Sequence, residues 1–163
     1  MIFIGIDPGA SGAIASITSG VPSIVKLEGM TERDVADMLI ASSGPDTFCL
    51  IEKVHAWPSV VRDKNGGCPA CGLKMLRGAN AQWSFAQNYG MLRGIICAVS
   101  ALTQMRWEDV TPQAWQKLMG ASSDKAANRE KAQALFPDLK VAKYAADALL
   151  ISEYCRRTTA RSE

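Results

Sequence analysis

The chain begins with a short apolar run that ends in a carboxylate, Ile2-Phe3-Ile4-Gly5-Ile6-Asp7. Its isoleucines recur at every second position and would share one face of a strand, whereas Phe3, Gly5 and Asp7 would share the other. Because both faces carry apolar residues, the pattern predicts a central strand of a sheet covered by helices on both sides. Asp7 would then end this strand, at the edge of the sheet where α/β proteins usually keep their chemistry.

Four further segments have the pattern of strands, with apolar runs bounded by turn residues: 13–18, 21–28, 47–52 and 105–110. The first three strands of the chain follow one another through short turns, which predicts an antiparallel meander. A helix separates the strand 47–52 from this meander, so it should lie parallel to the first strand. Its last residue is Glu52, and parallel neighbours would bring Glu52 and Asp7 together. Two close carboxylates repel each other unless a cation lies between them, which favours a divalent metal site.

The helices are predicted from apolar spacings of three and four and from capping residues. Thr31 and Thr111-Pro112 are typical of helix starts. The expected helices span about 32–41, 81–102, 112–119, 123–135 and 143–157. The order of elements is that of the ribonuclease H fold. We therefore expect a single α/β domain over residues 1–163, with a five-stranded mixed sheet of three antiparallel strands plus two parallel strands, flanked by helices.

Length and composition agree with such a domain. The chain has 163 residues, of which 48% are hydrophobic, and this suits one compact core. The longest apolar stretch, 91–102, is interrupted by Arg93 and is too short to cross a membrane. Met1 leads directly into the first strand without a basic leader, so we expect a cytoplasmic protein with no membrane partner. The net charge of +2 favours a nucleic-acid partner only slightly.

Residues 54–79 form a long irregular segment between predicted elements, and segments of this kind inside a compact domain are usually functional or disordered. Basic and aromatic side chains concentrate in it. The candidates for contact with nucleic acid are His55, Trp57, Arg62, Lys64, Lys74 and Arg77. Trp57 could stack on an unpaired base, and the four basic residues from Arg62 onward could contact phosphates. A solvated surface loop, with Trp57 as its anchor, remains the alternative.

The five cysteines are an odd number and favour reduced thiols over a disulfide framework. Cys49, Cys97 and Cys155 lie in apolar or helical runs and are expected in the core. Cys68 and Cys71 form a Cys-x-x-Cys pair, which is half of a zinc site. One chain has difficulty supplying the other half, although two copies meeting at a two-fold axis could do so. A tight surface turn is the expected alternative to zinc.

A third acid, Asp147, lies near the start of the last predicted helix, among small residues that would let the helix approach the sheet closely. An acid in a first turn is also favoured by the helix dipole alone. Five segments of the chain, in this order, resemble the RuvC family of Holliday junction resolvases, especially its phage and prophage forms: Ile4–Gly12, Ile51–Ala56, Phe85–Gly94, Val110–Lys117 and Ala146–Ile151. The resemblance covers nearly the whole chain. It places the family's catalytic acids on Asp7, Glu52 and Asp147.

The resemblance departs from the family pattern just before Asp147. Family members usually carry a further acid or histidine there, whereas this chain has Ala142, Lys143 and Tyr144. Lys143 could pair with a carboxylate or the scissile phosphate, Tyr144 could hydrogen-bond a bound water, or the site could lack its second metal. Ser11, in the turn after Asp7, is a further candidate for supporting the site.

The resemblance implies a structure-selective endonuclease that resolves four-way DNA junctions with Mg²⁺ or Mn²⁺, normally two ions per active site, and leaves 5′-phosphate and 3′-hydroxyl ends. It also implies a homodimer that matches the two-fold symmetry of a junction. We expect the helix 81–102 at the interface, because Gly90 and Gly94 would leave a shallow stripe on it. A related nuclease acting on RNA–DNA hybrids and a branched-DNA-binding protein that does not cleave remain alternatives. An actin-like ATPase is excluded, because the chain is too short for its second phosphate-binding domain.

Overall fold

The computed structural model describes residues 1–9, 11–53 and 79–160, with the side chains of 79–85 excepted. Its strands are β1 (Ile2–Asp7), β2 (Ala13–Thr18), β3 (Val21–Lys26), β4 (Thr47–Glu52) and β5 (Arg106–Val110). Its helices are α1 (Glu32–Ser42), α2 (Ala79–Thr103), α3 (Pro112–Met119), α4 (Lys125–Leu135) and α5 (Ala146–Thr159), with a short 3₁₀ turn, η1 (Lys143–Ala145), directly before α5.

The strands form one mixed sheet in the order β3-β2-β1-β4-β5. The pairs β1–β2 and β2–β3 are antiparallel, whereas β1–β4 and β4–β5 are parallel. This confirms the predicted meander and the predicted parallel strands, and it is the ribonuclease H-like arrangement. Strand β1 is central, as its two apolar faces indicated.

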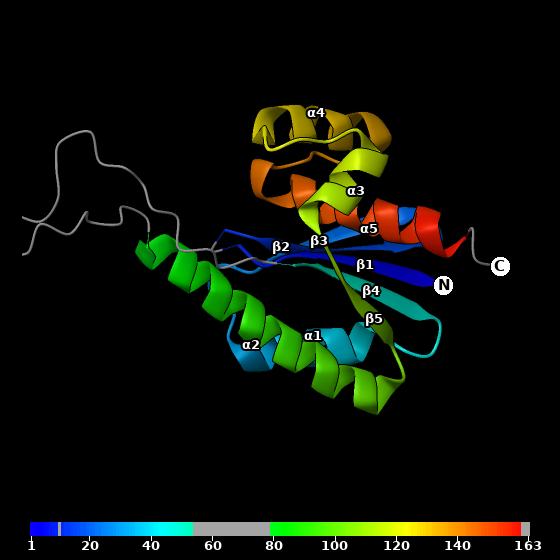
Figure 1. Cartoon of the computed structure of the whole chain (residues 1–163). Helices are drawn as coiled ribbons and strands as arrows, with labels where there is room; N and C mark the ends of the chain where they lie inside the picture. The colour runs from blue at the N-terminus through cyan, green and yellow to red at the C-terminus, as the bar shows by residue number, and fades with distance from the viewer. Residues whose placement is uncertain (10, 54–78, 161–163) are drawn as a thin grey trace, which may run out of the picture.

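Helices cover both faces of the sheet (Figure 1): α1 and α2 lie on one side, and α3, α4 and α5 lie on the other. The alternation along β1 sorts its side chains between two cores. Ile4 and Ile6 pack with Leu39 and Ile96 on the side of α1 and α2. The opposite core is built around α5 and contains alanines of β2 together with the fully buried Trp115 of α3.

Gly5 allows α5 to lie directly on β1. A methyl group at this position would overlap the backbone of Ala148 and Ser152, so no larger residue fits without moving the helix. The close contact fixes the height of α5 above the strand. Its first turn, which carries Asp147, therefore lies beside the end of β1, which carries Asp7.

The predicted element boundaries need small corrections. Helix α2 begins at Ala79, earlier than expected, α4 begins at Lys125, later than expected, and the predicted helix 143–157 is a 3₁₀ turn followed by α5. Cys49 and Cys155 are buried as predicted, but the prediction for Cys97 was wrong, because this residue is exposed on α2. In the part of the chain that the structure describes, no helix is both long and apolar enough to cross a membrane.

Candidate active site

Two carboxylates reach the same side of the sheet because of the register between β1 and β4. Ile6 pairs with Ile51, so Asp7 and Glu52 follow at equivalent positions at the ends of two parallel neighbours. Ile6 and Ile51 point toward α1 and α2, and the next residue on each strand therefore points toward α5. The predicted meeting of Asp7 and Glu52 at one edge of the sheet is confirmed.

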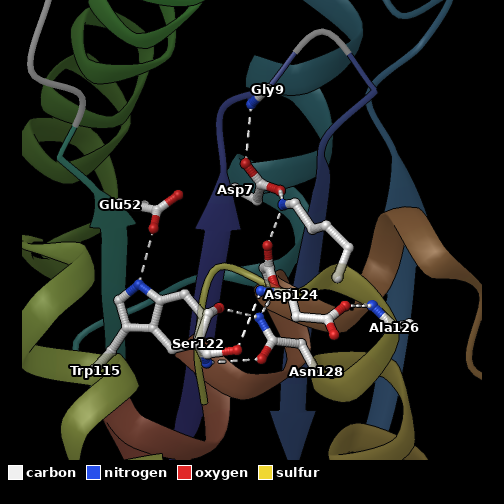
Figure 2. Close-up of polar contacts among 10 residues, drawn as sticks. Asp7, Gly9, Glu52, Trp115, Ser122, Asp124, Ala126 and Asn128 are labelled. Atoms are coloured by element: carbon white, nitrogen blue, oxygen red, sulfur yellow. Dashed lines mark hydrogen bonds and ion pairs between the residues drawn. The ribbon is translucent and has the colours of Figure 1, made fainter.

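Asp147 supplies the third carboxylate from the first turn of α5, and like Asp7 it is only 5% exposed. A lysine joins these two acids. The Lys125 ammonium forms an ion pair with Asp147 Oδ2 and lies 3.5 Å from Asp7 Oδ2. The other oxygen of Asp7 accepts a hydrogen bond from the Gly9 amide at 3.0 Å, as Figure 2 shows. The ammonium thus links the acids of β1 and α5.

Lys125 is held in position by the start of α4. Asp124 caps this helix by accepting a hydrogen bond from the Ala126 amide at 2.8 Å. One turn further on, the buried Asn128 donates to Asp147 Oδ1 at 2.8 Å and to the Ser122 carbonyl at 2.9 Å, and it accepts from the Ser122 amide at 3.0 Å (Figure 2). Asn128 therefore ties the loop before α4 to Asp147, and both oxygens of Asp147 are engaged.

Glu52 is oriented by a tryptophan. The indole Nε1 of Trp115 donates a hydrogen bond to Glu52 Oε1 at 2.9 Å, and Figure 2 shows this carboxylate between the indole and Asp7. Trp115 is fully buried, and Thr111 caps the N-terminus of its helix by accepting from the Ala114 amide. Since a buried ring has little freedom, it restricts the rotamers of the carboxylate that it contacts.

The site carries more negative charge than its one lysine can balance. Burial raises the pKa of Glu52 to about 7; the bond from Trp115 opposes this shift, and the charges of Asp7 and Asp147 add to it. Burial likewise raises the pKa of Asp7, against the opposing effect of Lys125. A raised carboxyl pKa means that the ionised form is disfavoured by its surroundings. The arrangement therefore favours the binding of additional positive charge.

The donor set fits a hard divalent cation in its chemistry, since carboxylate oxygens are the preferred ligands of Mg²⁺ and Mn²⁺. The positions of these carboxylates do not form a complete metal site. Within the described ranges, no group of three or more histidine, cysteine, aspartate or glutamate side chains is arranged to hold a metal ion. Asp7 and Asp147 converge on Lys125, and Glu52 is turned toward Trp115. Asp7 and Glu52 end two adjacent parallel strands on the same face of the sheet.

The three candidates for supporting the site lie elsewhere. Lys143 and Ser11 are exposed, and the described contacts link neither of them to a carboxylate of the site. Tyr144 packs against the core around α5, and the ammonium of Lys26 lies 5.3 Å from the centre of its ring. A role for these residues in the site stays a prediction.

The predicted nucleic-acid contacts lie outside the described residues. These are His55, Trp57, Arg62, Lys64, Lys74 and Arg77, and the same holds for the predicted zinc ligands Cys68 and Cys71. The structure brings three further residues to the site that were not expected there from the sequence: Trp115, Lys125 and Asn128. The sequence places Lys125 and Asn128 one turn apart after a capping aspartate, but it contains no sign that this side of the helix meets Asp147.

The sequence matches no protein-family model and no curated protein. Solved structures do resemble the chain. RuvC of Thermus thermophilus in complex with a Holliday junction substrate aligns with a TM-score of 0.60 at 13% identity, over 99% of this chain and 96% of that one. A Thermus thermophilus RuvC structure gives a TM-score of 0.58 at 14% identity over the same shares. At this level of identity the likeness establishes a shared fold.

Proposed function

We propose that this chain is a divalent-metal-dependent endonuclease that cuts four-way DNA junctions, with Asp7, Glu52 and Asp147 as its catalytic carboxylates. The observation that carries the proposal is the carboxylate cluster itself. Acids from β1, β4 and α5 meet at the carboxyl end of the central strands, where burial raises the pKa of two of them. The sheet that carries them has the fold of a RuvC protein solved with a Holliday junction.

The chain's own residues would prepare this site for phosphodiester hydrolysis. The negative charge of the cluster of Asp7, Glu52 and Asp147 would attract Mg²⁺ or Mn²⁺, which supplies charge neutralisation on the phosphoryl oxygens and activation of the attacking water. Trp115 fixes the orientation of Glu52, and Asn128 that of Asp147. The side chain of Lys125 is half exposed, and its ammonium would also contact the scissile phosphate. The expected products are 5′-phosphate and 3′-hydroxyl ends.

A homodimer would match the two-fold symmetry of a junction. Helix α2 is the proposed interface. On one side it is fixed to β5, because Tyr89 donates to Asp109 at 2.6 Å and Arg93 donates to the same carboxylate at 3.2 Å. Gly90 and Gly94 are exposed, and an added methyl group at either one would meet no described atom within 4 Å. This open stripe would allow the helix of a second copy to pack closely.

The test is cleavage of a labelled mobile four-way junction beside a linear duplex and an RNA–DNA hybrid, each in Mg²⁺, Mn²⁺ and chelator. We expect paired, metal-dependent nicks near the crossover, and none on the linear duplex. Cleavage of the hybrid alone would instead identify a ribonuclease H-type activity. Junction binding that persists in chelator, with no cleavage in either metal, would identify a binding protein and contradict the proposal.

A further inference from the structure

The positive charge of Lys125 lies where a bridging cation would lie between Asp7 and Asp147. The ammonium pairs with Asp147 Oδ2 and approaches Asp7 Oδ2 to 3.5 Å. Both carboxylates are 5% exposed, so the contact is formed at a largely desolvated position. An ammonium at such a position provides part of the charge neutralisation that a metal would provide.

The three acids differ in how fully their oxygens are engaged. Asp147 accepts from Asn128 on one oxygen and from Lys125 on the other. Glu52 accepts from Trp115 on Oε1, and the described contacts include no hydrogen bond to its Oε2. Since every buried side-chain oxygen of the described residues has a partner, Glu52 Oε2 is open to solvent. Glu52 thus retains a free ligand atom, whereas Asp147 is engaged on both oxygens. Asp7 lies between these two cases: its Oδ1 accepts from the Gly9 amide at 3.0 Å, and its Oδ2 lies 3.5 Å from the Lys125 ammonium.

We propose that the site binds one divalent cation, on Asp7 and Glu52, and that Lys125 takes the place of a second cation between Asp7 and Asp147. The inference rests on the proposed metal-dependent function and deepens it. It accounts for the absence of an acid at positions 142–144, because no further ligand is needed beside a lysine. It also balances the charges: three carboxylates are neutralised by one divalent ion and one ammonium.

Asp147 is then a positioning residue: it holds the Lys125 ammonium against Asp7, and it is not required as a metal ligand. Asn128 supports this task, since it holds the other Asp147 oxygen from the same helix that carries Lys125. A metal site built on three ligating carboxylates would instead lose its ion when Asp147 is neutralised.

The experiment counts the Mn²⁺ ions that the full chain binds, from the EPR signal of unbound Mn²⁺ during a titration. The variants are Lys125→Met, Asp147→Asn and Asp7→Asn. The matched control is Lys131→Met, which removes the same charge from an exposed position on the same helix α4. Circular dichroism verifies that each variant is folded.

We expect one ion per chain in the wild type, in Lys131→Met and in Asp147→Asn, two ions in Lys125→Met, and none in Asp7→Asn. Two ions in the wild type, or a single ion in Lys125→Met, would overturn the inference and leave the proposed metal-dependent nuclease intact. Loss of the ion in Asp147→Asn would overturn it in the same way. A wild type that binds no Mn²⁺ would contradict the inference and the proposed function together.

Discussion

The two halves of helix α5 place buried acids in opposite electrostatic surroundings. Near its start, Asp147 belongs to a cluster of three carboxylates that share one lysine. In its second half, the 3% exposed Glu153 is paired with two arginines: Arg156 donates to both of its oxygens at 2.7 and 2.8 Å, and Arg157 donates at 2.7 Å. One end has an excess of negative charge, and the other has an excess of positive charge.

The pKa values follow this difference. Burial raises the pKa of Glu153, but the hydrogen bonds from Arg156 and Arg157 outweigh it, so the pKa lies below its usual value. At the other end burial prevails, and the pKa values of Asp7 and Glu52 are raised. A paired acid contributes to folding, whereas an unbalanced one opposes it. Acids whose ionisation destabilises the folded protein are typical of functional sites, where the chemistry requires them. Ion-pair networks with a purely structural role can also shift a pKa.

The substitution with the largest expected effect displaces helix α5 as a whole, together with both of its buried acids. Gly5→Ala places a methyl group against the backbone of Ala148 and Ser152, so α5 must move away from β1. We expect a loss of about 3 kcal/mol or more in the free energy of unfolding, which is typical of severe overpacking. Urea unfolding measures it, with Gly44→Ala as the control, because a methyl group at Gly44 would meet no described atom within 4 Å. Equal stability of the two variants would contradict the account of α5.

The next largest loss of stability is expected for Glu153, the acid that is paired with two arginines. Glu153→Gln keeps the shape of the side chain and removes its charge, which weakens the hydrogen bonds from Arg156 and Arg157. The arginines are 46% and 40% exposed and can be resolvated, so we expect a loss of about 2 kcal/mol. Urea unfolding at pH 7 measures the loss, and Glu130→Gln on the exposed side of α4 is the control. An unchanged stability would show that the pairing contributes nothing.

The two ends should respond oppositely to pH when no metal is present. The pKa of Glu52 rises on folding from 4.5 to about 7, so ionisation destabilises the protein as the pH rises from 4.5 toward 7. The pKa of Glu153 is lowered on folding, so its contribution is present above 4.5 and is lost as the pH falls below that value. In the absence of metal, the contribution of Glu153 should therefore decline below about pH 4.5, and that of Glu52 should decline above it.

Glu52→Gln separates the contribution of this one acid from the rest. It should remove the decline between pH 5 and pH 7, a difference of about 1–2 kcal/mol once the partial exposure of Glu52 is taken into account. Thermal unfolding at several pH values, in chelator, measures this difference. A decline of the same size in Glu52→Gln would assign the effect to another group.

The smallest expected effect concerns the orientation of Glu52. Trp115→Phe keeps a ring in the core but removes the donor to Glu52 Oε1. We expect about a tenfold lower kcat, the equivalent of one lost hydrogen bond, and an unchanged KM for the junction. Trp107→Phe on β5 is the control, since Trp107 contacts Arg93 and not the site. A rise in KM without a loss of kcat would contradict a positioning role.

The features that could be predicted from the sequence are those that depend on the local alternation of apolar and polar residues. Alternation along β1 and β4 was enough to place Asp7 and Glu52 on one face of neighbouring parallel strands, and the structure confirms it. Lys125 and Asn128 could not be assigned, because their meeting with Asp147 depends on how α4 packs against α5. The contact of Tyr144 with Lys26 of β3 likewise arises from the tertiary placement of the turn before α5.

The decisive experiment compares wild type with Asp7→Asn in two measurements on the same preparations: cleavage of a four-way junction in Mn²⁺, and free energy of unfolding in chelator at pH 7. We expect Asp7→Asn to lose at least about a thousandfold in cleavage and to be as stable as the wild type or more stable, because the substitution removes a buried carboxylate whose charge opposes folding. Junction cleavage at the wild-type rate by Asp7→Asn would contradict the claim that this cluster is the active site.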